Sequence, residues 1–376
     1  MNEGEEFLGF PRSNGAVGIR NKIVVLSSVV CANTVVRRVA AKVDNAIAIT
    51  HPYGCGQWAI SYSNTFNILA GLASNPNVYG ALVIGLGCET LFSNRLADRI
   101  RESEKPVKSF NIQDVKGGTI SAIEKGITIC KRLNKEAGQI KREWFDFSNI
   151  TLGLECGGSD FSSGISANPS LGIVSDKLVN LGGTSILPEF AEWSGAHHLL
   201  SKRAINEQVA EEIMNLFKGK RFENRSPGNI EGGLSSPEEK SLGNIAKGGK
   251  STIQGVLQYT EKPKGKGLWL MVEPGLDVVS MTALAAAGVN IIVFTTGRGT
   301  PFGSPVAPVI KVCGNPKTCD YMANNIDIDA SQIITNGKSI EDISSLLWKK
   351  LVNVCNGEKT ISEKLGFEED IGIWRA

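Results

Sequence analysis

The 376-residue sequence lacks a strong excess of either charge, because its 40 basic and 38 acidic residues leave a formal net charge of +2. This balance gives no reason to expect nucleic acid or an anionic membrane surface as a partner, since both attract a basic surplus. No apolar run reaches the roughly 20 residues that a membrane-spanning helix needs. The acidic start MNEGEEFLGF is also unlike a secretory leader, which is basic and then apolar. We therefore expect a cytoplasmic protein.

Cysteine pairs of the CxxC type are absent as well, although the sequence contains eight cysteines. In the cytoplasm such cysteines are thiols, metal ligands or core residues rather than disulfide partners. Histidine is scarce, with only three residues in the chain. Glycine, in contrast, is abundant with 42 residues and gathers beside polar residues. That grouping is typical of tight loops which bring the backbone close to a ligand.

The pattern along the chain predicts an α/β fold. Apolar, β-branched runs alternate with stretches of helical periodicity, which is typical of parallel strands covered by helices on both faces. In the first half the predicted strands span 22–30, 46–50, 78–87 and 107–113, and a long helix is expected over 119–137. The pattern restarts at 149–156, and a chain of this length exceeds one ordinary core. We therefore predict two α/β domains, 1–148 and 149–376, as Rossmann-like units with mainly parallel sheets.

The second half adds predicted strands at 184–189, 267–273, 290–296 and 309–313, and helical stretches at 192–205 and 206–219. Residues 222–251 are polar and rich in glycine, which predicts a long ordered loop or excursion. In open parallel sheets, ligands bind beyond the carboxyl ends of the strands. We therefore expect the active-site cleft where the strand-end loops meet.

Four cysteines follow four different predicted strands: Cys31, Cys55, Cys88 and Cys156. A cysteine at a strand end is often no more than a small apolar core residue. The alternative is that three or four thiolates converge from separate loops and hold an iron ion or an iron–sulfur cluster. Both interpretations remain open on these residues alone.

His51 stands in the stretch HPYGCGQ, directly after a predicted strand and before a proline that favours extended backbone. Its imidazole is suited either to binding a metal or to acting as a base near neutral pH. A purely structural turn is the competing interpretation. Glu89, in GLGCET, and Asp160, in CGGSD, are the other candidates for the catalytic base.

The strand-end loops of the second half form a polar cradle that suits a carboxylate. Arg298, in TTGRGTPFG, has a guanidinium that can make two parallel hydrogen bonds to a carboxylate, and Ser159 and Thr296 add hydroxyl groups. The competing role for Arg298 is to satisfy carbonyl groups of its own loop. No phosphate-binding P-loop or dinucleotide fingerprint is present, so a nicotinamide cofactor is not supported.

Several blocks of the sequence together resemble the altronate/galactarate dehydratase family of sugar-acid lyases. They are GFPRSNGAVGIRN, HPYGCGQ, NPNVYGALVIGLGCE, CGGSDFSSGISANP, GNIEGGLSSPEEKSLGNIAKGG and FTTGRGTPFGSPVAPVIKV. The resemblance runs in order from about residue 9 to the carboxyl end. HPYGCGQ and GLDVVSMTALAAAGV resemble the altronate dehydratase branch more than the related large subunit of sulfolactate sulfo-lyase.

This resemblance implies a hydro-lyase that removes water from a 2,3-dihydroxy acid and yields a 2-keto-3-deoxy acid. The family implies dependence on iron, as Fe²⁺ or a cluster, or on manganese. A divalent metal would hold the carboxylate and hydroxyl and acidify the proton on carbon 2. A base then removes that proton, and we rank His51 before Glu89 and Asp160 for this role.

The chain departs from many family members in one respect. Those members begin with a small β-rich domain of under ~100 residues, whereas this sequence starts where their large part starts. Either a separate small subunit supplies that part, or the chain is truncated. We therefore expect a small β-rich partner or self-association, because the large part alone would leave site surface uncovered.

Overall fold

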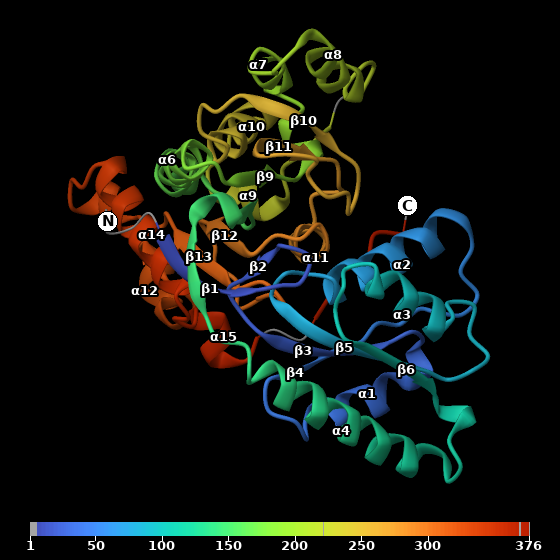
Figure 1. The fold of residues 1–376 in the computed structure, drawn as a ribbon. Helices are drawn as coiled ribbons and strands as arrows, with labels where there is room; N and C mark the ends of the chain where they lie inside the picture. The colour runs from blue at the N-terminus through green and yellow to red at the C-terminus, as the bar shows by residue number, and fades with distance from the viewer. Residues whose placement is uncertain (1–5, 221, 368–369, 376) are drawn as a thin grey trace.

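The computed structural model describes residues 6–220, 222–367 and 370–375, and two parallel sheets organise this part of the chain (Figure 1). The smaller sheet has the strand order β4-β3-β5-β6. Its strands are β3 (Lys22–Ser27), β4 (Ala46–Ile49), β5 (Val78–Gly85) and β6 (Val107–Asn111). Helices α1 (Asn33–Ala40) and α4 (Gly118–Ala137) cover one face, and α2 (Ala59–Ala73) and α3 (Ser93–Arg101) cover the other.

The larger sheet has the order β10-β11-β9-β8-β12-β13-β14, and every pairing in it is parallel. Its strands are β8 (Thr151–Cys156), β9 (Thr184–Leu187), β10 (Ile253–Leu257), β11 (Gly267–Met271), β12 (Ile291–Thr296), β13 (Val309–Cys313) and β14 (Ile328–Asp329). Helices α6 (Ala167–Asn180) and α14 (Ile340–Cys355) pack on one face. On the other face lies α11 (Asp277–Ala286), which also packs against α2. The predicted parallel α/β architecture is confirmed.

A small antiparallel sheet of order β2-β1-β7 was not expected from the sequence. Its strands are β1 (Glu6–Pro11), β2 (Val17–Gly18) and β7 (Glu143–Asp146). β1 pairs with β7, so the start of the described chain lies beside the segment that connects the two parallel sheets. These strands are short and mostly not buried, and they therefore carry little of the apolar signal from which a strand is recognised.

The segment 222–251, predicted as a long ordered loop or excursion, is not a loop throughout, because it contains two helices. These are α9 (Pro227–Glu231) and α10 (Pro237–Ala246). Ser226 and Ser236 cap them by accepting hydrogen bonds from backbone N–H groups, and a proline occupies the first turn of each. The high glycine content of the segment favoured the prediction of a loop, although the serine and proline at the start of each helix indicate a helix start.

The remaining short helices complete the second half: α5 (Phe161–Ile165), α7 (His197–Ser201), α8 (Glu207–Leu216), α12 (Pro316–Tyr321), α13 (Gln332–Thr335) and α15 (Ile361–Leu365). Within the helical stretch predicted over 192–205, only the five residues of α7 form an α-helix, after a 3-10 helix that ends at Trp193. Among the helices that the structure describes, none combines the length and apolar character needed to cross a bilayer.

Candidate active site

The structure gathers the predicted site residues into two groups, one at the carboxyl ends of each parallel sheet. The group on the smaller sheet follows β3, β4 and β5 and contains Cys31, His51, Cys55, Cys88 and Glu89. The group on the larger sheet follows β8 and β12 and contains Cys156, Ser159, Asp160, Thr296 and Arg298. Among the described residues, one group has ligand atoms close enough to hold a metal ion. It combines Cys156 with the carboxylates of Glu189 and Glu192 and contains no second cysteine.

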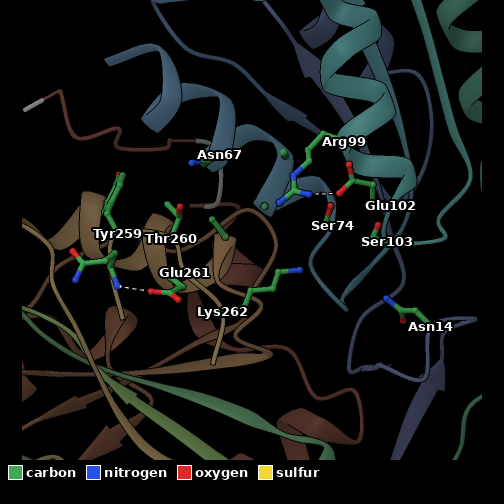
Figure 2. A pocket seen from close by; sticks show the side chains of 14 residues that line it. Asn14, Asn67, Ser74, Arg99, Glu102, Ser103, Tyr259, Thr260, Glu261 and Lys262 are labelled. Atoms are coloured by element: carbon green, nitrogen blue, oxygen red, sulfur yellow. Dashed lines mark hydrogen bonds and ion pairs between the residues drawn. The ribbon is translucent and has the colours of Figure 1, made fainter. Parts of the chain in front are cut away.

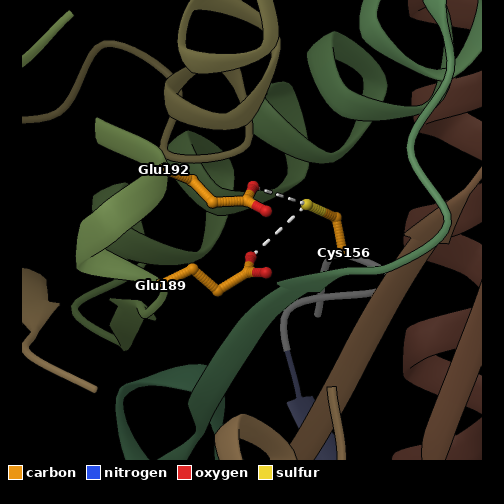
Figure 3. Close-up of side chains that lie close together, drawn as sticks. All are labelled: Cys156, Glu189 and Glu192. Atoms are coloured by element: carbon orange, nitrogen blue, oxygen red, sulfur yellow. Dashed lines mark hydrogen bonds between the residues drawn. The ribbon is translucent and has the colours of Figure 1, made fainter. Parts of the chain in front are cut away.

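Cys156 is the centre of a buried polar cluster at the end of β8. Its Sγ lies 3.4 Å from Oε2 of Glu189 and 3.6 Å from Oε2 of Glu192 (Figure 3). Glu189 follows β9, and Glu192 lies in the 3-10 turn after it. The ligand atoms of these three residues lie within 4.8 Å of one another, so the group could hold a metal ion.

Helix α10 supplies the cations of this cluster. Nζ of the fully buried Lys247, at the end of the helix, donates to Oε2 of Glu189 at 2.6 Å. Nζ of Lys240 lies 2.6 Å from Oε1 of Glu192. Between them Asn244 donates to Oε2 of Glu192 at 2.7 Å. The spacing of four and then three residues places all three side chains on one face of the helix.

Acidic groups outnumber basic ones in this cluster. Glu155 and Glu273 are also fully buried, which gives four carboxyl groups against two ammonium groups. Burial, followed by the nearby Glu189, raises the pKa of Glu155 well above its usual range and that of Glu273 to about 8. Neither carboxyl oxygen of Glu155 has a hydrogen-bond partner in the described structure. A buried surplus of acid is neutralised by protons or by a cation.

The donor set fits a transition metal on chemical grounds. One thiolate and two carboxylates suit iron or zinc better than magnesium or calcium, which prefer oxygen ligands alone. Burial raises the pKa of the Cys156 thiol, so the thiol is protonated until a cation replaces that proton. Oε2 of Glu189 also accepts a hydrogen bond from the ammonium of Lys247.

A polar pocket of about 420 Å³ opens beside the cluster. Cys156, Glu192 and Lys240 form part of its wall, together with Asp277 and Arg225. The carboxylate of Asp277 lies against the backbone of Gly157, where an added Cβ would be 2.1 Å from Oδ2. Burial and the nearby Glu192 raise the pKa of Asp277 above its usual range. A hydrogen bond from its own backbone N–H lowers the pKa, but by less. The pocket has the size of a site for a small polar molecule.

Ser159 and Asp160 follow Cys156, but their side chains have different surroundings. The hydroxyl of Ser159 lies 3.6 Å from Sγ of Cys156 and faces the pocket. Asp160 caps α5, with Oδ1 accepting from Ser163 N at 2.8 Å and Oδ2 accepting from Asn315 Nδ2 at 2.6 Å. Both carboxylate oxygens of Asp160 are thus engaged in holding local structure.

Thr296 and Arg298 lie on a loop that packs against the Cys156 loop. The backbone N–H of Arg298 donates to the carbonyl of Gly158 at 3.0 Å. Oγ1 of Thr296 accepts from Gly299 N at 2.8 Å and thereby braces the turn. The Arg298 side chain is half-exposed and only 3.6 Å from a carboxylate oxygen of the exposed Glu231. Arg298 is therefore held loosely, and neither Arg298 nor Thr296 belongs to the residues that line the pocket beside Cys156.

His51 and Glu89 both have their polar atoms engaged in the smaller sheet's loops. Nε2 of His51 lies 2.9 Å from the carbonyl of Ser27, and Nδ1 accepts from Tyr53 N at 3.2 Å. Burial lowers the pKa of His51 to about 4, which keeps the ring neutral. The carboxylate of Glu89 accepts from Ser28 Oγ at 2.7 Å and from Gly87 N at 2.6 Å. These contacts give both residues a role in holding the loops.

A larger cavity of about 630 Å³ lies elsewhere, where the ends of α2 and α3 face residues 258–262 (Figure 2). Arg99 and Glu102 form an ion pair on its wall, and Lys262 projects from the opposite side. None of the predicted site residues lines this cavity. The smaller pocket beside Cys156 is therefore the better candidate.

The two halves of the chain match two models of a single family. Residues 9–138 match the model described as D-galactarate dehydratase/Altronate hydrolase, second domain, and residues 147–376 match D-galactarate/Altronate dehydratase, C-terminal. The chain belongs to the galactarate/altronate dehydratase family. The resemblance expected from the sequence blocks is thereby confirmed.

Individual relatives of this family member are similar over almost the whole chain. Altronate dehydratase of Bacillus subtilis (strain 168) is 37% identical, over 98% of this chain and 77% of its own length. Galactarate dehydratase (L-threo-forming) of Escherichia coli (strain K12) is 35% identical, over 99% of this chain and 77% of its own length. (2R)-sulfolactate sulfo-lyase subunit beta of Chromohalobacter salexigens is 36% identical, over 98% and 97%. All three names describe lyases.

Sequence reasoning missed most of the cluster around Cys156 in this family member: Glu189, Glu192, Lys240, Asn244, Lys247 and Glu273. A signal was present for two of them, because Glu189 and Glu273 directly follow the apolar runs of β9 and β11. The α10 residues could not be recognised as neighbours, because they share one face only if the segment is a helix, and the segment was predicted as a loop. Recognising the SSPEE start of α10 would have placed them on one face.

Proposed function

We propose that this chain is the large part of a metal-dependent hydro-lyase that dehydrates an altronate-like sugar acid to a 2-keto-3-deoxy acid. The observation that carries the proposal is the buried Cys156–Glu189–Glu192 group at the wall of a polar pocket. Such an elimination needs a base for the proton beside the carboxylate and stabilisation of the negative charge that follows. A site that pairs carboxylates with ammonium groups supplies both.

Asp277 is the proposed base. Its carboxylate lies in the pocket wall next to the Cys156 loop, and it does not belong to the metal-ligand group. Its raised pKa brings it nearer to the working pH, which is the condition that favours proton transfer. His51, Glu89 and Asp160 rank below Asp277 because their polar atoms already hold local structure.

The substrate's carboxylate is assigned to Arg298, whose loop packs against the Cys156 loop, with the Ser159 hydroxyl at the pocket wall and Thr296 bracing the Arg298 loop. Among the described residues, the guanidinium of Arg298 contacts only a carboxylate of Glu231 at 3.6 Å, whereas Arg225 on the pocket wall is held by two bonds to Glu223, at 2.8 and 3.1 Å. Lys240 lies at the pocket wall and adds positive charge where the enolate would develop. A bound metal at Cys156, Glu189 and Glu192 would supply Lewis-acid stabilisation, and iron or manganese is expected from the family.

A second candidate is a carbon–sulfur lyase acting on a sulfonated hydroxy acid. The observation that favours it is the similarity to the sulfo-lyase beta subunit, which is 36% identical over 98% of this chain. The same base and charge stabilisation serve either leaving group, water or sulfite. Because that relative is named as a beta subunit, the similarity also supports a small separate partner subunit, with self-association of the large chain as the alternative.

One assay separates these proposals. The metal-loaded chain is incubated with a panel of aldonic acids, aldaric acids and sulfolactate, alone and with a co-expressed small partner. Release of 2-keto-3-deoxy acid supports the dehydratase, and release of sulfite from sulfolactate supports the second candidate. A chain that binds metal, has its partner and transforms no member of the panel would contradict both.

A further inference from the structure

The polar cavity of about 630 Å³ lies outside the candidate active site, where the two halves of the chain meet (Figure 2). Helices α2 and α3 of the first half end on one side of it, and residues 258–262, which follow β10 of the second half, form the other side. Helix α11 connects the two sites. Asp277 at its start lines the pocket beside Cys156, and Ala286 at its end lines the cavity. That length of helix spans roughly 13 Å, so the two sites are separate.

Lys262 is the charged group of the cavity that lacks a partner. Its ammonium forms no ion pair and no hydrogen bond within the part of the chain that the structure describes. The carboxylates of the lining, in contrast, are both engaged. Glu102 pairs with Arg99, and Oε1 of Glu261 lies 3.1 Å from Nζ of Lys264. The cavity therefore offers one cation whose charge no described residue balances.

Further positive charge surrounds Lys262. Desolvation lowers the pKa of Lys262, and the nearby Arg99 lowers it further. Burial, followed by Arg12 and Lys262, likewise holds the pKa of Lys105 well below its usual range. Cations that lower one another's pKa are stabilised by a neighbouring anion. The side chain of Lys262 is reached by solvent, so an anion in the cavity can approach it.

The turn that carries Lys262 holds a strained residue. Thr260 lines the cavity and has a φ of +68°, in the left-handed region that β-branched residues rarely adopt. Two hydrogen bonds between Gln258 and Glu261 enforce this turn. Glu261 N donates to the carbonyl of Gln258 at 2.9 Å, and Gln258 N donates to Oε2 of Glu261 at 3.0 Å. Strain of this kind clusters at ligand sites, and here it fixes the position from which Lys262 crosses the cavity (Figure 2).

The rest of the lining indicates which anion fits. Neutral hydroxyl and amide groups predominate: Asn14, Asn67, Ser74, Ser103 and Thr260. Such groups donate and accept hydrogen bonds and therefore pair with hydroxyl groups of a ligand. The last carbonyls of α2 and α3 have no partner within their helices and can accept from the same hydroxyls. These helix ends, together with Glu102 and Glu261, disfavour a second negative charge on the ligand.

We propose that this cavity is a second ligand site, which binds a small polyhydroxylated monocarboxylate through the ammonium of Lys262. The carboxylate accepts from Lys262, and the hydroxyl groups pair with the amides, hydroxyls and helix-end carbonyls around it. The cavity volume is in the range of small-molecule sites. Binding here involves no catalytic step, so it stands apart from the proposed lyase activity. A ligand in this position contacts both halves of the chain and stabilises their junction.

Calorimetric titration of the full chain with gluconate tests the proposal, after a chelator has removed any metal that gluconate could coordinate beside Cys156. Glucose, which has the hydroxyl groups without the carboxylate, and inorganic phosphate, which has charge without the hydroxyl chain, are the comparison probes. We expect gluconate to bind at least about tenfold more tightly than either probe. Gluconate should also raise the temperature of thermal unfolding.

Two variants locate the site. Lys262→Met should weaken gluconate binding at least about tenfold, and Asn67→Trp should block it by filling the cavity from α2. Lys42→Met changes an exposed lysine just after α1 and is the matched control, which should bind as wild type does. Thermal unfolding without ligand checks that each variant folds.

Three results would overturn the proposal. The first is a wild-type chain that does not bind gluconate, and the second is one that binds phosphate or glucose as tightly. The third is equal gluconate affinity in Lys262→Met and wild type. If Arg298→Lys then lost that affinity, gluconate would be assigned to the neighbourhood of Cys156 instead. The titration measures no turnover, so a chain without lyase activity would leave this result unaffected.

Discussion

The ammonium group of Lys247 lies 2.6 Å from Oε2 of Glu189, and neither side chain is reached by solvent. Burial alone would lower the pKa of Lys247, but the surrounding Cys156, Glu189 and Glu155 outweigh it and raise the pKa. The lysine therefore remains charged and partly offsets the acid surplus beneath the pocket. A charge held in this way is costly to remove alone.

Replacing Lys247 should accordingly destabilise the fold. Lys247→Met leaves Glu189 buried without its counter-charge, and we expect a loss of about 3–5 kcal/mol in the free energy of unfolding. The double variant Lys247→Met/Glu189→Gln removes both charges and should recover much of that loss. Chemical denaturation at neutral pH measures all three proteins. Equal stability of Lys247→Met and wild type would mean that the Lys247–Glu189 ion pair contributes nothing to the free energy of unfolding.

His51 should make stability depend on pH. Its pKa is about 4 in the folded chain and 6.5 in the reference state, so between these values only the unfolded chain takes up the proton. Stability from this residue is therefore full above pH 6.5 and lost as the pH falls toward 4. Between pH 7 and 5 we expect a loss of about 2 kcal/mol in wild type.

His51→Leu removes this titration. The quantity to compare between His51→Leu and wild type is the change of the free energy of unfolding with pH, not its absolute value. Denaturation curves of both proteins at several pH values give the two slopes. An identical slope between pH 5 and 7 in both proteins would show that His51 does not remain neutral in the folded state.

The parallel sheets could be predicted because their strands are buried on both faces, as in KIVVLS of β3 and IIVFTT of β12. The grouping of Cys156 with Ser159 and Thr296, and of Cys31 with Cys55 and Cys88, follows from strand order alone. The lysines of α10 could not be placed, because their role depends on which strand ends the helix covers. The neutral state of His51 likewise comes from burial by residues distant in sequence.

Arg298→Lys should keep the fold and weaken substrate use. Lysine is a point charge and cannot reproduce two parallel hydrogen bonds to a carboxylate. The loss of one charged hydrogen bond, about 1.5–3 kcal/mol, corresponds to roughly a ten- to hundredfold fall in kcat/KM. Arg225→Lys serves as the matched control, since Arg225 is already engaged by Glu223. Steady-state kinetics that rank the two variants in the opposite order would assign the carboxylate to Arg225.

Gly54→Ala should disturb the cysteine loops of the smaller sheet. The new Cβ would lie 2.1 Å from the carbonyl oxygen of Ser28 at a φ of +104°. We expect destabilisation of about 1–3 kcal/mol. Gly56→Ala meets open space at a φ of +65° and should cost less. Calorimetry compares the stability of the two variants, and equal stability would contradict the close packing of these loops.

Kinetics of Asp277→Asn on the best sugar acid of the panel, with metal and any required partner present, test the central claim most directly. Asparagine keeps the shape of the pocket wall but cannot accept the proton. We predict a fall in kcat of about 10²–10⁴, with KM within a few-fold and metal content unchanged. Turnover by Asp277→Asn at the wild-type rate would show that the pocket beside Cys156 does not use this carboxylate as its base.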